Sequence, residues 1–247
     1  MSVVIAVDWT VPGRKVIILS VIRRLYVHNF RCLQNFELKP GELTSLLLIG
    51  KNGSGKSTVG AALEILQRVG RGTSHVKSLF APGDSGLSGA DMPVTLEVEA
   101  LIGEATFSYQ LTLDRADPFG HRTVWEERLL LNGVPFFTRE QLSIDKSLVA
   151  LPLLQEGSPS EPISKFRNWL RQILIIRPIP SLSVGESREG TLFPDPSVRN
   201  FGEWFSGLVR QAPKAYGLIL DYQKVVLPDL SEIRSPQVGQ NAYSLEI

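Results

Sequence analysis

The stretch that decides the fold is Gly50-Lys51-Asn52-Gly53-Ser54-Gly55-Lys56-Ser57, which fits the pattern G-x-x-x-x-G-K-[ST] at every fixed position. Glycines at these positions allow successive backbone N–H groups to converge on one point, where they can bind phosphate oxygens. Lys56 is expected to reach the β- and γ-phosphates of a nucleotide, and the Ser57 hydroxyl is expected to bind Mg²⁺. The motif therefore predicts a phosphate-binding loop at the N-terminus of a helix.

The residues on both sides of the loop support this prediction. Residues 44–49 form a short apolar run that is typical of a buried parallel strand. After the loop, apolar residues recur with the spacing of one helical face, at Val59, Ala62, Leu63, Leu66 and Val69. Gly70 and Gly72 are expected to end this helix. The sequence thus predicts strand, loop and helix in the order that a phosphate-binding loop requires.

Composition limits the class of protein. The chain has 247 residues, of which 43% are hydrophobic and 21% charged, as in an ordinary globular protein. Its formal net charge of +1 gives no support to DNA as a partner. A single cysteine excludes an internal disulfide framework and favours the cytoplasm. The apolar run at residues 16–22 is too short to span a membrane, and we interpret residues 1–20 as an N-terminal extension.

Two regions are predicted to form β-sheet. In the core around the loop, residues 21–72, strands are expected at 25–30 and 33–38. Residues 94–138 alternate apolar and polar side chains, which predicts a meander of four antiparallel strands. Asn132-Gly133 is typical of the tight turn of its last hairpin.

Residues 160–230 have helical spacing. One helix is predicted to begin at Pro162 and another at Asp195-Pro196. A third is predicted to run from about Pro213 to Leu227. Together with the loop and the strands, this segment predicts an α/β fold.

Two other classes of phosphate-binding-loop protein fit the sequence less well. A GTPase would need a base-reading [NT]-K-x-D element, which the chain lacks. Residues 117–120 match D-x-x-G, but they are expected in a turn between two meander strands. The meander also argues against the compact frame of a small-molecule kinase.

The pattern resembles the ATP-binding-cassette-type heads of the RecF, Rad50 and SMC group, especially overcoming-lysogenization-like AAA family ATPases of bacterial defence and repair. The resemblance is carried by residues 25–31 and 48–58, including Asn52 within the loop. It implies a P-loop fold with a mixed sheet, the meander and the helical segment, over residues 21–247. It also implies ATP and Mg²⁺ as cofactors, a homodimer formed through ATP-bound heads, and a nuclease or effector partner that acts in DNA repair or antiviral defence.

The resemblance also implies roles for particular residues. The loop from Gly50 to Thr58 would hold the triphosphate, with Lys56 as the catalytic lysine and Ser57 as a magnesium ligand. Arg31 matches a position where some members aim an arginine at the phosphates, although it could equally be a surface arginine in a turn. Gln155 is the best candidate for the glutamine that approaches the metal in these heads, with an ordinary loop residue as the alternative.

The sequence departs from this family in one important respect. A working head needs a Walker B strand that ends in Asp-Glu, a signature loop and a switch histidine, and none is found here. The nearest Walker B mimic ends at Asp221, but Tyr222 follows it and the spacing around it is helical. We therefore expect this chain to be the N-terminal part of a longer head, in which hydrolysis depends on motifs beyond residue 247.

Two alternative functions stay open at this point. The chain could be a regulatory module that binds a nucleotide without hydrolysing it, which the missing acidic residues favour. It could also be the nucleotide-binding subunit of a transporter, although the signature Leu-Ser-Gly-Gly-Gln of that class is absent.

Overall fold

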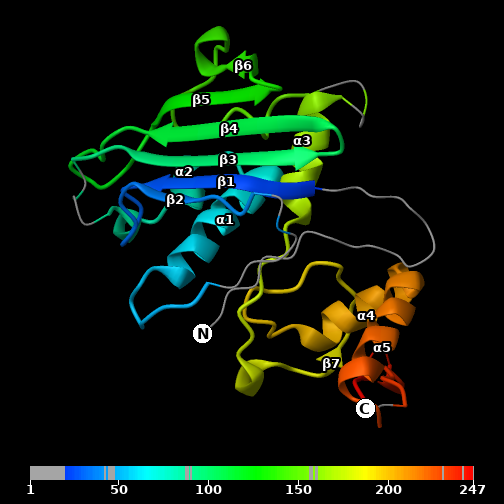
Figure 1. Cartoon of the computed structure of the whole chain (residues 1–247). Helices are drawn as coiled ribbons and strands as arrows, with labels where there is room; N and C mark the ends of the chain where they lie inside the picture. The colour runs from blue at the N-terminus through cyan, green and yellow to red at the C-terminus, as the bar shows by residue number, and fades with distance from the viewer. Residues whose placement is uncertain are drawn as a thin grey trace. The chain divides into compact units, whose positions relative to one another are not determined.

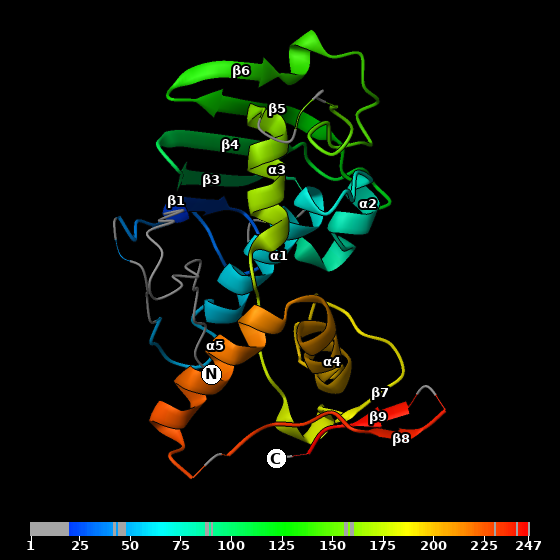
Figure 2. The same ribbon diagram turned by 90° about the vertical axis from the view of Figure 1, so that its right-hand side faces the viewer.

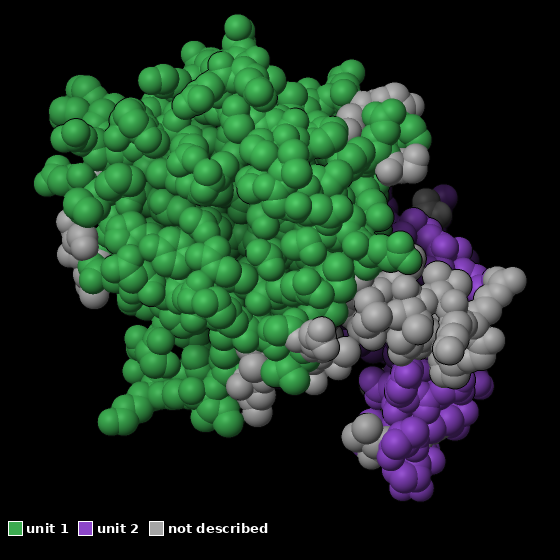
Figure 3. All heavy atoms as spheres, turned by 45° about the horizontal axis from the view of Figure 1, so that its top comes forward, with its two compact units in different colours: residues 1–175 green, residues 176–247 purple. Residues whose placement is uncertain are grey.

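The structure is a computed structural model that forms two compact units, residues 1–175 (unit 1) and 176–247 (unit 2) (Figure 3). The residues that it describes are 20–41, 43, 48–86, 89, 91–155, 158, 161–229, 231–240 and 242–246. The boundary between the units falls inside the segment 160–230 that was predicted to be helical, so that the first helix of this segment belongs to unit 1 and the others to unit 2.

Unit 1 is built on a six-stranded sheet with the strand order β2-β1-β3-β4-β5-β6 (Figure 1). Its strands are β1 (Ser20–His28), β2 (Phe36–Leu38), β3 (Val94–Ile102), β4 (Ala105–Leu113), β5 (Val124–Leu131) and β6 (Val134–Thr138). The four predicted meander strands are confirmed, and Asn132 and Gly133 both have positive φ, as their turn requires. Because β1 pairs with β3 from Ser20 to His28, the N-terminal strands and the meander form one sheet.

The first strand differs from the prediction at both ends. It begins at Ser20 rather than at residue 25, because the long strand β3 offers it a partner over that whole length. It ends at His28, since Asn29 and Arg31 take left-handed backbone conformations with φ of 51° and 52°. Every strand pair described is antiparallel. The predicted parallel strand at 44–49 falls largely on residues 44–47, which lie outside the described residues.

Three helices of unit 1 lie on one face of this sheet: α1 (Lys56–Gly70), α2 (Val76–Leu79) and α3 (Pro162–Gln172) (Figures 1 and 2). The strands bury every second side chain beneath them, as β3 does from Val94 to Ile102. Helix α3 crosses the C-terminal end of α1, where a Cβ atom on Gly70 would lie 2.7 Å from the backbone nitrogen of Arg171. The N-terminus of α1, which carries the loop, therefore lies at the other end of the helix from this crossing.

Unit 2 combines two helices with a small antiparallel sheet of strand order β7-β9-β8. Its elements are β7 (Glu186–Ser187), α4 (Phe201–Gln211), α5 (Pro213–Val226), β8 (Gln237–Gly239) and β9 (Ala242–Ser244). Short 3₁₀ turns complete the two units, at Pro82–Asp84 (η1), Arg139–Gln141 (η2) and Pro180–Leu182 (η3). The predicted helix from about Pro213 is confirmed as α5, and Asp221 lies exposed on it.

The prediction that a helix begins at Asp195-Pro196 is wrong, because α4 begins at Phe201. The Asp195 carboxylate accepts a hydrogen bond from the backbone N–H of Ser197, at 2.7 Å, and Val198 has a φ of 59°. Such local bonds offer the backbone an alternative to the helix. At residues 195–198 these bonds favour a turn, and α4 starts only after it.

Candidate functional site

The loop between residues 50 and 57 has the backbone that its glycines were expected to provide. Gly53 and Gly55 have φ values of 82° and 90°, and Gly55 is the residue that precedes the first turn of α1. A Cβ atom on Gly55 would lie 2.8 Å from the Cδ2 atom of Leu33. The turn between β1 and β2 therefore packs directly against the loop, and a larger residue at position 55 would have to displace the Leu33 side chain.

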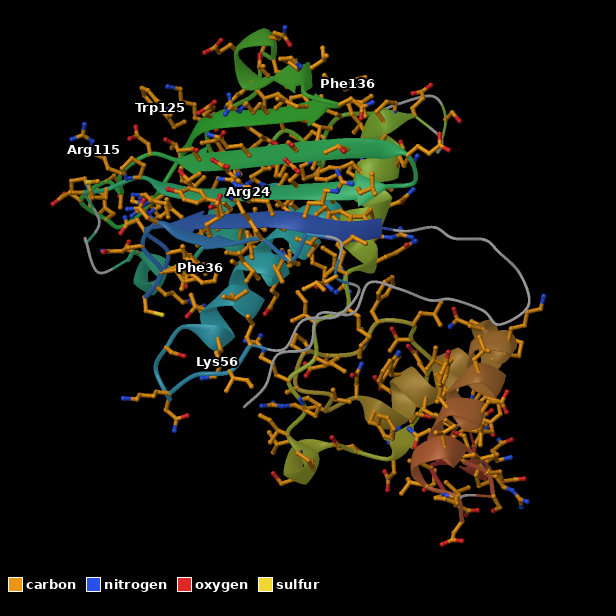
Figure 4. All side chains as sticks on the ribbon, viewed as in Figure 1. Arg24, Phe36, Lys56, Arg115, Trp125 and Phe136 are labelled. Atoms are coloured by element: carbon orange, nitrogen blue, oxygen red, sulfur yellow. The ribbon has the colours of Figure 1, made fainter. Side chains whose placement is uncertain are left out.

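The side chain of Lys56 folds back over the loop (Figure 4). Its ammonium group donates to the carbonyl oxygens of Gly50 and Lys51, at 2.6 and 2.8 Å. It also lies 3.2 Å from the hydroxyl oxygen of Ser54. The positive charge is thus held over the loop backbone, where the motif predicts that phosphate oxygens bind.

The first turn of α1 adds further anion-binding groups. The leading backbone N–H groups of any α-helix have no acceptor within the helix, and the helix dipole favours negative charge there. Ser57 is exposed in this turn, whereas Thr58 is buried with its hydroxyl oxygen 3.3 Å from the sulfur of Cys32. A hydroxyl is the kind of oxygen ligand that Mg²⁺ accepts, so Ser57 fits its predicted role and Thr58 anchors the helix to the β1–β2 turn.

Arg31 lies beside the loop but is engaged by another partner. Its Nε atom donates to the Asp84 carboxylate at 2.8 Å, and its backbone N–H donates to the carbonyl oxygen of the same residue at 3.1 Å. The side chain lines a hollow of about 240 Å³ together with Ala61 and Ile65, one to two turns beyond Ser57 along α1. Its predicted contact with the phosphates stays a prediction.

The structure places Gln155 away from the loop. The preceding carbonyl oxygen, that of Leu154, accepts a hydrogen bond from Arg167 at 2.7 Å. The backbone of Arg167 adjoins Gly70, the last residue of α1, whereas Ser57 lies in the first turn of α1. The geometry therefore does not bring Gln155 and Ser57 together, and the metal-binding role of Gln155 stays a prediction without support from the geometry.

Three features of the loop's surroundings were not predicted from the sequence. They are the pairing of Arg31 with Asp84, the contact between Ser54 and Lys56, and the position of Cys32 against Thr58. Asp84 lies 53 positions after Arg31, so no local pattern could have signalled their contact. Within the described part of the chain, no group of three or more His, Cys, Asp or Glu residues could hold a metal ion.

A second polar cluster in unit 1, the Glu127 cluster, is buried under the sheet. The Glu127 carboxylate accepts hydrogen bonds from the Tyr109 hydroxyl, the backbone N–H groups of Ala150 and Leu151, and the Arg139 guanidinium. Burial raises the pKa of Glu127, although the two backbone N–H groups, Tyr109 and Arg139 each act to lower it. With every partner supplied by the protein, this cluster holds residues 139–151 against strands β4 and β5.

Comparison with known proteins gives a family match, and it covers the part of the chain that contains the loop. No curated protein matches the chain. No helix in the described ranges is long and apolar enough to cross a membrane. Residues 21–94, which contain the loop, α1 and all of β1 except Ser20, match the family model described as an AAA ATPase domain, and this match indicates that the chain binds a nucleotide.

Proposed function

We propose that this chain binds ATP together with Mg²⁺ as the N-terminal part of a cytoplasmic ATPase head. The observation that carries the proposal is the position of Lys56, whose ammonium group lies over a glycine-rich loop at the start of α1. The match of residues 21–94 to an AAA ATPase domain supports it independently of the geometry.

The proposal assigns a role to each part of the loop. Backbone N–H groups from Gly50 to Thr58 surround the triphosphate, and Lys56 stabilises the negative charge on its terminal phosphates. Ser57 supplies a hydroxyl oxygen to Mg²⁺, which neutralises phosphate charge when it is bound. Each role needs only side chains and backbone that already lie at the N-terminal end of α1.

The wider function is proposed from the resemblance to RecF, Rad50 and SMC heads. In this proposal two ATP-bound heads associate, and closure of the dimer is coupled to a nuclease or effector in DNA repair or antiviral defence. For this chain by itself the proposal covers ATP binding and not hydrolysis, because no Walker B strand is found in the sequence and Asp221 lies exposed on helix α5. Hydrolysis is assigned to a composite site that two heads complete.

Direct measurement of ATP binding tests the first part of the proposal. Isothermal titration with ATP and Mg²⁺ is expected to give a saturable signal for the wild type and none for Lys56→Ala. Lys77→Ala is the matched control, since Lys77 is an exposed lysine on α2 of the same unit. Equal binding by the wild type and Lys56→Ala would contradict the assignment of the loop.

The single cysteine offers a second readout of ATP binding. Cys32 is exposed, and its sulfur lies 3.3 Å from the Thr58 hydroxyl oxygen in the first turn of α1. ATP bound at this turn is expected to slow the reaction of Cys32 with a thiol reagent, and Lys56→Ala is expected to remove this protection. A reaction rate that ATP does not change would argue against binding at the loop.

Two further measurements separate the proposal from its alternatives. Analytical ultracentrifugation with and without ATP is expected to show dimers only with ATP. Single-turnover hydrolysis by this chain, lost in Lys56→Ala, would eliminate a module that binds without hydrolysing. A monomer at saturating ATP would remove the dimeric head from the proposal while leaving ATP binding intact.

A further inference from the structure

The Ser54 hydroxyl lies between Gly50 and Lys56, two fixed residues of the motif. Its oxygen is 3.2 Å from the nitrogen of the Lys56 ammonium group. A Cβ atom on Gly50 would lie only 2.8 Å from the same oxygen. The backbone N–H of Ser54 donates to the carbonyl oxygen of Lys51 at 3.2 Å, which holds this residue in the turn.

The contacts of Lys56 use all of its hydrogen-bonding capacity. An ammonium group has three N–H donors, and three acceptors surround this one: two backbone carbonyl oxygens and the Ser54 hydroxyl oxygen. Phosphate oxygens that bind Lys56 draw on the same donors. Every phosphate contact of Lys56 therefore replaces a contact with the loop, and the loop and the nucleotide compete for one cation.

We propose that Ser54 is a positioning residue that sets the nucleotide affinity of the loop by competing with phosphate for Lys56. The inference rests on the proposed function, because it assumes that the loop binds ATP. Of the three acceptors, the Ser54 hydroxyl is the one that belongs to a side chain, so it is the one that an amino-acid substitution can remove. Its bond to Lys56 involves a charged donor and is the longest of the three, at 3.2 Å.

Removing the hydroxyl shifts the competition toward the nucleotide. Ser54→Ala is expected to lower the Kd for ATP by about threefold, since one bond to the ammonium group no longer has to be exchanged at this exposed site. Ser54→Thr keeps the hydroxyl and is expected to restore the wild-type Kd. Ser78→Ala removes an exposed serine hydroxyl on α2 and is the matched control, with an unchanged Kd.

The experiment is a titration of the four proteins with ATP and Mg²⁺, paired with urea unfolding of each in the absence of nucleotide. A tighter Kd for Ser54→Ala, reversed in Ser54→Thr, supports competition, because a purely structural role of Ser54 would lower affinity or stability. An unchanged Kd, or a weaker one, overturns the inference.

The titration also distinguishes this inference from the proposed function. Lys56→Ala is titrated beside the four proteins. If the wild type binds ATP and Lys56→Ala does not, while Ser54→Ala equals the wild type, only the role of Ser54 is wrong. If the wild type shows no binding, the proposed function fails and the role of Ser54 fails with it.

Discussion

Lys56 and Glu127 are both charged side chains of unit 1 with several hydrogen-bond partners, yet their surroundings differ. Lys56 is partly exposed at the start of α1, and its partners all belong to one glycine-rich loop. Glu127 is fully buried on β5, and its partners come from three separate places in the chain. The partners of Lys56 can be exchanged for those of a ligand, whereas the partners of Glu127 cannot change without opening the core.

The difference indicates how to separate a binding charge from a structural one. A search for functional residues by shifted pKa values alone would choose Glu127, because burial raises its pKa. Its carboxylate is nevertheless satisfied entirely by the protein, so it has no remaining contact to offer a substrate. Access to solvent and partners that can be exchanged, rather than an unusual pKa, are the features on which the proposed role of Lys56 rests.

The largest expected effect comes from breaking the Glu127 cluster. Glu127→Ala leaves the buried Arg139 without its carboxylate and two backbone N–H groups without an acceptor. We expect a loss of about 3–5 kcal/mol in the free energy of unfolding, measured by urea denaturation. Glu126→Ala, at the partly exposed neighbour, is the control, with a loss of about 1 kcal/mol or less. Equal losses in the two variants would contradict a structural role for Glu127.

Titration of Glu127 is expected to change the free energy of unfolding by a smaller amount, and in a direction that its pKa determines. The pKa of Glu127 in the folded state lies above its unfolded value of about 4.3. The stabilisation that this difference provides is therefore complete below the unfolded pKa and is lost as pH rises through the folded-state pKa. The free energy of unfolding of the wild type, relative to that of Glu127→Gln, is therefore expected to fall as pH rises from about 4. Other carboxylates titrate in both proteins and cancel in this difference. A difference that increases with pH would show that the pKa of Glu127 is lowered.

Alanine substitutions at two glycines of the loop are expected to lower the free energy of unfolding by smaller amounts, and the two variants form a matched pair. Gly53→Ala is expected to cost about 1 kcal/mol, since its φ of 82° is unfavourable for alanine but its Cβ would meet no atom within 4 Å. Gly55→Ala has the same conformational penalty and also forces a Cβ to within 2.8 Å of Leu33, so about 2 kcal/mol is expected. Urea unfolding measures both, and equal losses would mean that Leu33 moves aside freely.

The smallest expected change in stability is that of Lys56→Ala. The side chain is partly exposed and bonded only within its own loop, so the free energy of unfolding is expected to stay within about 0.5 kcal/mol of the wild type. The same variant is expected to lose ATP binding. A large loss of stability in Lys56→Ala would place this lysine in the same structural class as Glu127.

Local patterns were enough to predict several elements. The spacing of glycines, lysine and serine predicted the loop, and the helical spacing that follows predicted α1. Alternation predicted the four meander strands, and Asn132-Gly133 predicted their last turn, because both signals depend on residues close together in the sequence. The onset of α4 was missed, since a turn around Asp195 competes with the helix there.

By itself, the sequence determined the glycine-rich loop, the helix after it and the meander, since each depends on backbone conformations that a few neighbouring residues decide. Only the tertiary structure decided which distant residues meet. It joined β1 to β3 in one sheet, paired Arg31 with Asp84, and buried Glu127 among partners from three segments. Such contacts depend on how whole strands and helices pack, and no local spacing records that packing.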